Sequence, residues 1–531
     1  MYRTYFVVVN DSQYKDTVHQ ELVGATGSQT IPNREVICIN PMPFSDYNGT
    51  FVLSDEEAIA LKADSRIRDV HLSPADVGAE AKPLGIRSGN YDKTVNAVTA
   101  SSTKNWGLAR CISASNNFGT LSTLTNYSYN LTGAGVDIII VDTGVEPWHP
   151  EFAVNNNGTG GTRFVDIDWT TYGAISVAPL GGFAGDCDGH GTNCASIAAG
   201  NTHGWASDAK IYSLRVLGST TNRDVTDNRL LGSVDDLQAW QTIKLFHESK
   251  SVDPATGYKR PTIVNASYGY SVAYNYMTSV THRGHTYSAT TTTGNASLCF
   301  GTLGTNTSPG DGSCPYRYTA LDADVSSAIA AGVIVCGAAG NDAHKNDIPT
   351  GPDYNNYWTS SVYGNNYYHQ GASPTSADGV ICVGAVSYAT PEHKGQFSNT
   401  GPRVDIFAPG WMITGAYSSS SVSGFASYAD PRSSSSTSSG ATYYINRLTG
   451  TSMASPQIAG ICALFAQLRP QSTGSTVKSW VTGTAVKNML DETYYGVLTS
   501  TGTYTTWGHL QGAINNYAYM PYNLPNPLTI V

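Results

Sequence analysis

The sequence predicts a doubly wound α/β domain with a mostly parallel sheet, preceded by a small α+β unit. From Trp106 to about Leu468, short apolar runs alternate with helical stretches, which is typical of a parallel sheet covered by helices on both faces. Residues 1–80 contain fewer elements of both kinds, and residues 81–105 are rich in Gly, Ser, Thr, Asn and Lys, as flexible linkers are. We therefore expect two folded parts joined by a linker.

The small unit has one helix with a clear start signal. Ser54 precedes three acidic residues, so it can cap a helix over Asp55–Ala63 whose first turn carries negative charge. Apolar runs predict strands at residues 4–9, 35–39 and 68–72. Helices and strands therefore mix within this unit, as in an α+β fold.

Six apolar runs predict the strands of the large domain. They cover residues 136–141, 210–217, 262–267, 333–338, 380–386 and 404–407. Among the helical stretches between them, one is predicted over Ser233–Lys250, with Ser233 as its N-cap and Asp235 and Asp236 near the positive end of the helix dipole. This alternation favours a parallel sheet.

Three stretches are longer than the loops of a compact domain. We interpret them as insertions into a domain over residues 106–517, and they lie near residues 270–318, 344–372 and 418–442. The final residues, 518–531, contain three prolines and predict an extended tail on the surface.

Composition excludes several classes of protein. A hydrophobic content of 40% over 531 residues is ample for a large core. The net charge of -10 arises without any long basic run, so nucleic acid is not expected as a partner. No stretch reaches the roughly 18 apolar residues of a membrane span, and the N-terminus lacks the features of a secretory signal. We therefore expect a soluble protein without a membrane partner.

The nine cysteines fall into different settings. Cys336, Cys382 and Cys462 lie in apolar runs and are interpreted as small buried hydrophobic residues. Cys299 and Cys314 share a polar stretch and could pair in an oxidising compartment, but spacing alone leaves this open.

Asp142 ends a predicted strand, in the run Val-Asp-Thr-Gly-Val. Active sites of open α/β sheets form at the carboxyl ends of strands, and an ionised Asp there can orient an imidazole ring. Asp-Thr-Gly also occurs in aspartic proteases, but that chemistry needs a second such triplet or a dimer, and the chain has no second copy. A turn-forming Asp without catalytic function is the simpler alternative.

His190 lies between two glycines in the run Asp-Gly-His-Gly-Thr-Asn-Cys, just before a predicted helix. Glycines on both sides allow another chain to approach the ring closely. Cys187, His190 and Cys194 have spacings that could suggest zinc, but no second pair of ligands accompanies them. Cys194 is better interpreted as a residue packed beneath the histidine.

Ser452 opens an apolar helix in the run Gly-Thr-Ser-Met-Ala-Ser-Pro. At a helix N-terminus a nucleophile experiences the positive end of the dipole, and its own N–H can point toward a developing oxyanion. Pro456 is predicted within the first turn, where its missing N–H costs little. The acid and the histidine precede the serine, whereas in α/β hydrolases they follow it.

The order Asp142, His190, Ser452 and the three surrounding motifs resemble the subtilase family over roughly Trp106–Leu468. The resemblance implies a fold of subtilisin type in which these three residues form a catalytic triad and the Asn341 amide completes an oxyanion hole. It implies that substrate backbone is bound by two segments, formed by Ser267, Tyr268 and Gly269 and by Ala338, Ala339 and Gly340. Residue 457 is Gln where most members have His, and Tyr268 replaces the usual leucine.

The resemblance carries three further expectations. Residues 1–80 resemble the family's inhibitory propeptide, a small ferredoxin-like domain, chiefly through the run that begins at Asn48. The chain is then a zymogen cut within residues 81–105, and its own propeptide is an intramolecular inhibitor. Chemistry requires no cofactor, but structural calcium is possible at Asp405, with the backbone carbonyls of Asp378 and Val380.

The resulting interpretation is a serine endopeptidase that cleaves polypeptides through an acyl-enzyme. The rival is a structural or binding module with a subtilase fold and little proteolysis, which the long insertions and the polar composition would suit. No signal peptide is recognised, so the sequence leaves the localisation unknown, and a cytoplasmic, a non-classically exported and a virion-associated protein are all open.

Overall fold

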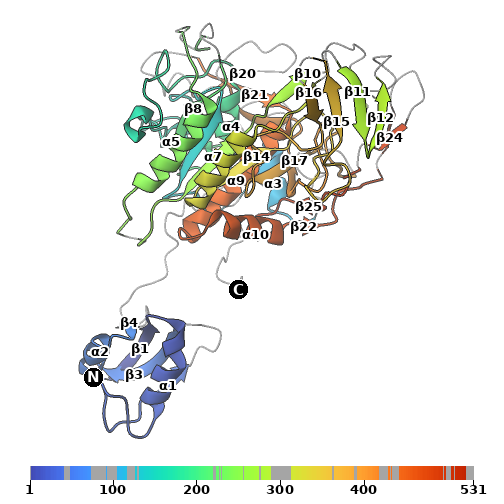
Figure 1. The fold of residues 1–531 in the computed structure, drawn as a ribbon. Coiled ribbons are helices and arrows are strands. Elements are labelled where there is room, and N and C mark those ends of the chain that lie inside the picture. Colours follow the sequence, from blue (N-terminus) through green and yellow to red (C-terminus); the bar gives the residue numbers. More distant parts are fainter. Residues whose placement is uncertain are drawn as a thin grey trace. The chain divides into compact units, whose positions relative to one another are not determined.

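The computed structural model divides into two compact units, Met1–Leu84 and Gly85–Val531 (Figure 1). The structure describes residues 2–40, 48–72, 91–92, 105–115, 126–127, 129, 131–218, 223–225, 228, 230–254, 256–273, 277–288, 313–361, 364–387, 391–417, 428–430, 432, 442–493, 495–497, 504–506 and 509–521. Most of the expected linker, 81–105, and most of the insertion at 418–442 lie outside these ranges.

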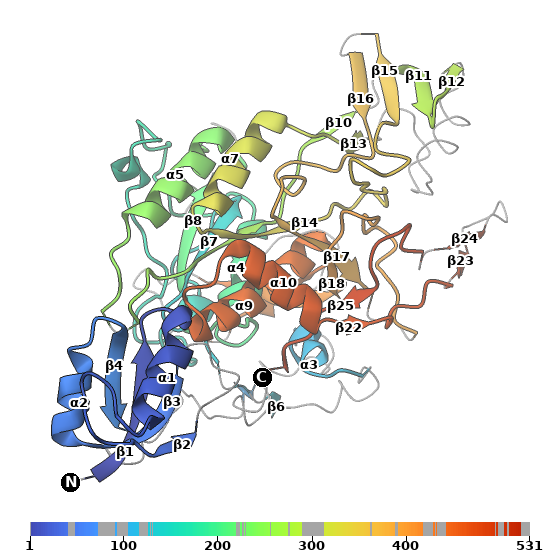
Figure 2. The same ribbon diagram turned by 60° about the horizontal axis from the view of Figure 1, so that its bottom comes forward.

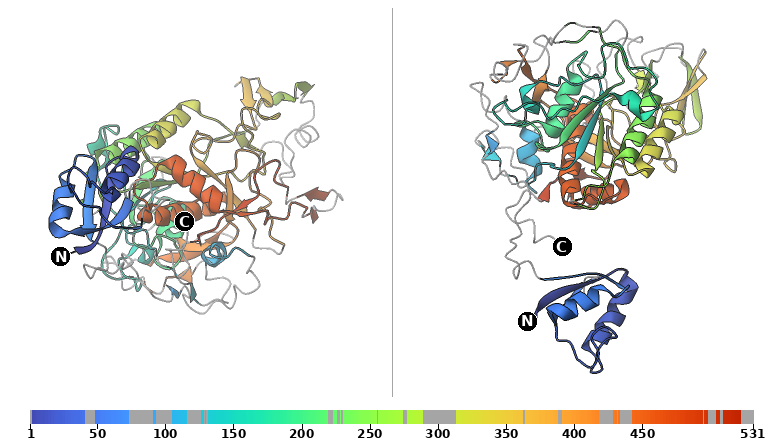
Figure 3. Two further views of the ribbon diagram at one scale, coloured as in Figure 1. Left: turned by 90° about the horizontal axis from the view of Figure 1, so that it is seen from below. Right: turned by 90° about the vertical axis from the view of Figure 1, so that its left-hand side faces the viewer.

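The first unit is a four-stranded sheet with two helices. Its elements are β1 (Tyr2–Val9), α1 (Lys15–Val23), β2 (Cys38–Asn40), β3 (Asn48–Ser54), α2 (Asp55–Lys62) and β4 (Ile67–Leu72). The antiparallel order β2-β3-β1-β4 is that of a ferredoxin-like fold. Both helices contribute to one apolar cluster on the same face of β1 (Figure 3). The predicted cap is confirmed, because Ser54 and Glu57 form a reciprocal capping box.

The second unit contains an eight-stranded sheet in the order β22-β25-β18-β17-β14-β9-β7-β8. In that order the strands are Val486–Lys487, Asn516–Tyr517, Ile406–Pro409, Ile381–Val386, Ile334–Ala338, Thr262–Ala266, Asp137–Asp142 and Lys210–Arg215. The six from β18 to β8 are parallel and correspond to the six predicted strands. The predicted α/β class is confirmed.

Helices cover both faces of this sheet (Figure 2). They are α3 (Trp106–Cys111), α4 (His190–Ala199), α5 (Asp236–Ser249), α7 (Thr319–Ala330), α9 (Thr451–Leu468) and α10 (Gly474–Thr484), with short 3-10 turns at Pro150–Phe152 and Trp169–Tyr172. The side chains of strand β7 alternate between the two faces of the sheet. Ile139 and Val141 pack in the cluster with α5 and α7, whereas Ile138 and Ile140 pack in the cluster with α4 and α9. A strand buried on both faces explains the continuous apolar run.

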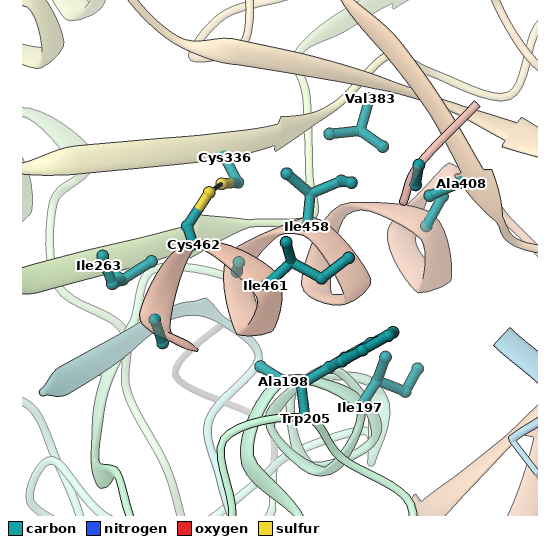
Figure 4. Close-up of a cluster of buried hydrophobic side chains, with 14 of the residues drawn as sticks. Ile197, Ala198, Trp205, Ile263, Cys336, Val383, Ala408, Ile458, Ile461 and Cys462 are labelled. Atoms are coloured by element: carbon teal, nitrogen blue, oxygen red, sulfur yellow. Dashed lines mark hydrogen bonds between the residues drawn. The ribbon is translucent and has the colours of Figure 1, made fainter. Parts of the chain in front are cut away.

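Helix α9 is the centre of the larger core (Figure 4). Its residues Ile458, Ile461 and Cys462 are fully buried between α4 and the sheet. Cys462 Sγ lies 4.0 Å from Cys336 Sγ of β14, and both thiols are free, as expected for cysteines that act as buried hydrophobic residues.

The insertions near 270–318 and 344–372 form one joint sheet. Its order is β12-β11-β15-β16, with β11 at Met277–His282, β12 at His285–Ser288, β15 at Tyr357–Ser360 and β16 at Gly364–Tyr367. It lies to one side of the large unit, beyond β10 (Ser271–Ala273), which pairs with β13 at Ser313–Pro315 (Figures 1 and 2). Cys314 is a free, buried thiol here, and Cys299 lies outside the described residues.

Smaller sheets complete the described chain. They are β19 (Ile413–Tyr417), β21 (Tyr444–Leu448) and β20 (Tyr428–Ala429), the pair β23 (Tyr495–Val497) with β24 (Tyr504–Thr506), and the pair β5 (Tyr91–Asp92) with β6 (Asn126–Tyr127). Among the described helices, none is long and apolar enough to cross a membrane.

Two expectations need correction. Helix α5 begins at Asp236 with Asp235 as its N-cap, not at Ser233, because the Val234 N–H bonds to the Arg215 carbonyl oxygen (2.8 Å) and Asp235 is still extended. The expected surface tail does not start at residue 518. Ala518 is fully buried, and its N–H donates to the Phe407 carbonyl oxygen (2.8 Å).

Candidate active site

Asp142 lies at the carboxyl end of a central strand. It is the last residue of β7, and its side chain is fully buried. Its Oδ1 is 2.8 Å from His190 Nδ1. Two glycines allow the elements to meet, because a Cβ on Gly144 would clash with the Gly185 carbonyl oxygen and one on Gly191 would clash with the carbonyl oxygen of Gly144. The end of β7 therefore packs directly against the start of α4.

His190 begins α4, and a buried carboxylate holds the loop before it. Asp186 Oδ1 accepts hydrogen bonds from the N–H groups of Asp188 (3.0 Å) and Gly189 (2.9 Å), and Oδ2 accepts one from the Thr192 N–H (2.9 Å). Burial nevertheless raises the pKa of Asp186. These bonds fix the direction in which the His190 ring leaves the helix.

The carboxylate of Asp142 controls the protonation of His190. Burial lowers the pKa of the His190 ring, but the opposite charge of Asp142 and the hydrogen bond to it outweigh burial, so the pKa is well above its usual value. A proton on Nδ1, donated to Asp142, leaves Nε2 as the nitrogen that can accept a proton. This arrangement suits a general base.

Ser452 is the second residue of α9 and is mostly buried. Cys194 links it to the histidine, because the thiol is 3.9 Å from His190 Nδ1 and donates to the Ser452 carbonyl oxygen (3.3 Å). The Ser452 hydroxyl donates to the Ser267 carbonyl oxygen (3.1 Å). The structure therefore brings the three expected triad residues together from β7, α4 and α9.

Pro456 has a different place from the one expected. Helix α9 begins at Thr451, so Pro456 lies in its second turn, and its missing N–H would have bonded to the Ser452 carbonyl oxygen. That oxygen accepts instead from Ser267 Oγ (3.0 Å) and from Cys194 Sγ. A proline four residues after the serine is the sequence signal for this arrangement, and the predicted place of Pro456 in the first turn was wrong.

Asn341 is oriented by the residue before Ser452. Its Oδ1 accepts from the Thr451 N–H (2.8 Å) and from Thr451 Oγ1 (2.9 Å). A Cβ built on Gly450 would lie 3.5 Å from Asn341 Nδ2 and 3.6 Å from the Ser452 nitrogen. Two nitrogen atoms that can donate hydrogen bonds therefore lie near one another beside Gly450.

The two expected substrate segments continue neighbouring strands. Ser267–Gly269 follows β9, and Ala338–Gly340 spans the end of β14, which pairs with β9. The main chain of Ala339 is already engaged, because its N–H donates to the Val383 carbonyl oxygen (3.0 Å) and its carbonyl oxygen accepts from Asn399 Nδ2 (3.0 Å). Gly269 is exposed.

The residues around Asp405 do not fit a calcium ion. Asp405 Oδ2 pairs with Arg403 Nη1 (3.0 Å) and with Lys478 Nζ (2.9 Å). Arg403 Nη2 donates to the carbonyl oxygens of Thr375, Ala377 and Val380, at 2.7, 2.9 and 3.2 Å. Two cationic side chains therefore occupy the oxygen cluster in which a calcium ion was expected.

The zinc alternative is also not supported by the described residues. Cys187, expected as one possible ligand, donates its thiol to the carbonyl oxygens of Thr143 (3.3 Å) and Leu217 (3.5 Å). Asp142, His190 and Cys194 have potential ligand atoms within 4.8 Å of one another, but two of these atoms already form the Asp–His hydrogen bond.

Comparisons identify the family of the chain. The subtilase family model matches residues 133–513. An extracellular serine proteinase of Thermus sp. (strain Rt41A) is 29% identical over 401 residues, which cover 75% of this chain and 66% of the relative. The subtilisin-like serine protease Pen c 2 of Penicillium citrinum is 27% identical over 389 residues, covering 72% of this chain and 60% of the relative. The chain belongs to the subtilase family.

A crystal structure of a cold adapted subtilisin-like serine proteinase aligns with a TM-score of 0.46 and 22% identity, covering 78% of this chain and 98% of that chain. The chain spans between 54% and 66% of the length of the first three curated relatives. The match of the family model over residues 133–513 confirms the family resemblance seen in the sequence.

Proposed function

We propose that the protein is a serine endopeptidase with Asp142, His190 and Ser452 as its catalytic triad. The observation that carries this proposal is the meeting of the hydrogen-bonded pair of Asp142 and His190 with the N-terminus of α9, where Cys194 contacts both the His190 ring and Ser452. Polypeptides are the proposed substrates, and no cofactor takes part in the chemistry.

In the proposed reaction, the Ser452 hydroxyl turns from the Ser267 carbonyl oxygen toward His190 Nε2 and gives it a proton. Ser452 Oγ then bonds to the substrate carbonyl carbon, and the carbonyl oxygen becomes an oxyanion near Asn341 Nδ2 and the Ser452 N–H. Breakage of the C–N bond releases the amine, which takes the proton from His190. A water molecule then attacks the acyl-enzyme by the same steps, with His190 again as the base, and releases the carboxylic acid product and the free Ser452 hydroxyl. Asp142 stabilises the charged imidazole throughout.

We further propose that residues 1–80 are an inhibitory propeptide domain, joined through residues 81–105 to the enzyme. The support is a separate compact unit with its own apolar core. Asn105 is almost fully buried, and its side chain bonds to the His203 carbonyl oxygen (2.7 Å) and to Gln457 Nε2 (2.9 Å). A cut after Asn105 would leave this buried residue on the propeptide, and the enzyme would lose these bonds when the propeptide leaves. We therefore place the processing site before Asn105.

The test compares the full chain with Ser452→Ala by intact mass and by labelling with a fluorophosphonate. We expect only the wild type to lose its N-terminal unit and to take up the probe. Ser455→Ala is the matched control, because Ser455 lies on the same helix and its hydroxyl bonds to Asn265 Oδ1 (2.8 Å), which is not a triad residue. If a folded wild type is neither cut nor labelled, the binding-module alternative replaces the protease.

A further inference from the structure

A buried carboxylate lies behind the first substrate segment. Asp236 is the first residue of α5 and only 8% exposed. Its Oδ1 accepts from the Tyr268 hydroxyl (2.6 Å), and its Oδ2 accepts from the Tyr270 hydroxyl (3.2 Å). These tyrosines flank Gly269, so a single carboxylate holds both sides of the exposed end of the segment.

The hydroxyl of Tyr268 is fixed from two sides. It accepts a hydrogen bond from Trp240 Nε1 (3.2 Å), and Trp240 is fully buried one turn further along α5. The Tyr270 ring packs edge-on against Tyr318 at 5.7 Å between ring centroids. The two phenol groups therefore connect the segment to α5 and to the start of α7.

Strand pairing does not hold this part of the chain. The last paired residue of β9 is Ala266, opposite Val141 and Gly337. Beyond it, Ser267 bonds to Ser452, and the next described main-chain bond runs from the Tyr270 N–H to the Ser373 carbonyl oxygen (3.1 Å). Between these points, Tyr268 and Gly269 form no described main-chain hydrogen bond, and the two tyrosine hydroxyls connect this stretch to Asp236.

We propose that Asp236 is a positioning residue that holds Tyr268 and Tyr270, and through them fixes the main chain of Ser267–Gly269 for binding an extended polypeptide. This inference rests on the proposed protease function. Asp236 touches no reacting atom, so it acts on substrate affinity and not on the chemical step. In the sequence, Asp236 was recognised only as an acidic residue that suits the N-terminus of a helix.

The electrostatic surroundings make this function dependent on pH. Burial raises the pKa of Asp236 to about 6, while the bonds from Tyr268 and Tyr270 oppose that rise. Asp235 is the neighbouring charge on α5 and raises the pKa further, and the other groups acting on Asp236 are the two phenols and the Trp240 indole. Above about pH 6 the ionised carboxylate accepts both phenol protons; below it, protonation weakens at least one of these bonds.

The test compares Asp236→Asn with the matched control Asp235→Asn. Asp235 is the N-cap, and asparagine caps a helix equally well, so the control removes one charge without touching a tyrosine. For a long peptide substrate at neutral pH, we expect Asp236→Asn to raise KM about 10-fold with kcat and fluorophosphonate labelling within about 2-fold of wild type. We expect wild-type KM to rise as pH falls from 7 to 5, and the KM of Asp236→Asn to stay flat.

Hydrogen exchange provides a measurement that does not depend on proteolysis. We expect amides of residues 267–270 to exchange about 10-fold faster in Asp236→Asn and at the wild-type rate in Asp235→Asn. The inference is overturned if these rates do not change, if kcat falls while KM is constant, or if both variants behave alike. If wild type neither cleaves nor labels, the proposed function fails, and the exchange rates alone then decide whether Asp236 positions the segment.

Discussion

The cationic cluster at Asp405 predicts that calcium does not stabilise this site in the wild-type protein. Arg403 and Lys478 both pair with Asp405 Oδ2, which also accepts from the Cys382 N–H (2.8 Å). The side chains of the three charged residues are between 14% and 26% exposed. The perturbation we propose is Arg403→Met, which keeps the length of the side chain and removes the guanidinium.

The magnitude follows from the bonds that are lost. Removal of one partner from a buried ion pair costs about 3–5 kcal/mol. Lys478 remains to pair with Asp405 and to bond to the Val380 carbonyl oxygen (2.9 Å), so we expect the lower end, about 3 kcal/mol of unfolding free energy. The variant leaves the carbonyl oxygens of Thr375 and Ala377 beside a carboxylate, a donor set that suits calcium. At ten times its dissociation constant, calcium would restore about 1.4 kcal/mol.

The assay is thermal unfolding of wild type, Arg403→Met and Asp405→Asn, each with calcium and with a chelator. Arg469→Met is the matched control, since Arg469 is exposed and the same charge is lost. We expect calcium to raise the unfolding temperature of Arg403→Met, and to leave that of wild type, Asp405→Asn and Arg469→Met unchanged. The reasoning is refuted if the chelator destabilises wild type and Asp405→Asn abolishes that loss, because calcium would then bind at Asp405 in the native protein.

Three further predictions concern the candidate active site and the insertion at 418–442. Asn341→Ala should lower kcat by about 10²–10³, the usual cost of removing one oxyanion-hole donor, with little change in KM, measured by steady-state kinetics. Because Asp142 raises the pKa of His190 and the base must be neutral, kcat/KM should fall as pH drops through a pKa above the ordinary histidine value; a pH profile with a midpoint at or below about 6.5 would contradict this. Arg432→Met should cost about 3–5 kcal/mol in denaturant unfolding, because it takes the guanidinium away from the fully buried Glu151 (2.6 Å), whose remaining partners are Thr202 and His203; an unchanged midpoint would show that the pair contributes nothing.

Much of the candidate site could be predicted because its residues occupy the ends of strongly patterned elements. Asp142 ends an apolar strand, and Ser452 opens an apolar helix, and both patterns depend only on neighbouring residues. Helix α5 shows the limit of such patterns. Ser233 and Asp235 are both good caps, and the choice between them was made by a main-chain bond from Val234 to Arg215 of a distant strand.

Contacts between distant segments escaped prediction for the same reason. The insertions near 270–318 and 344–372 were recognised separately, but β11 pairs with β15 across more than 70 residues, as Val280 opposite Trp358 shows. No local pattern encodes a partner at that separation. The ion pairs at the expected calcium site could not be predicted for the same reason, because Lys478 reaches Asp405 from α10.

The sequence by itself determined the two-part organisation, the alternation of strands and helices, the family, and the residues proposed for catalysis, because short-range periodicity and local motifs encode them. The Ser452 carbonyl oxygen loses its helical N–H partner because of Pro456, and the tertiary structure alone decided that the Ser267 hydroxyl and the Cys194 thiol donate to it instead. It also placed Asp236 behind Tyr268. Such contacts depend on packing between separate elements, in which the free energy of burying a polar group selects partners that the order of the residues does not reveal.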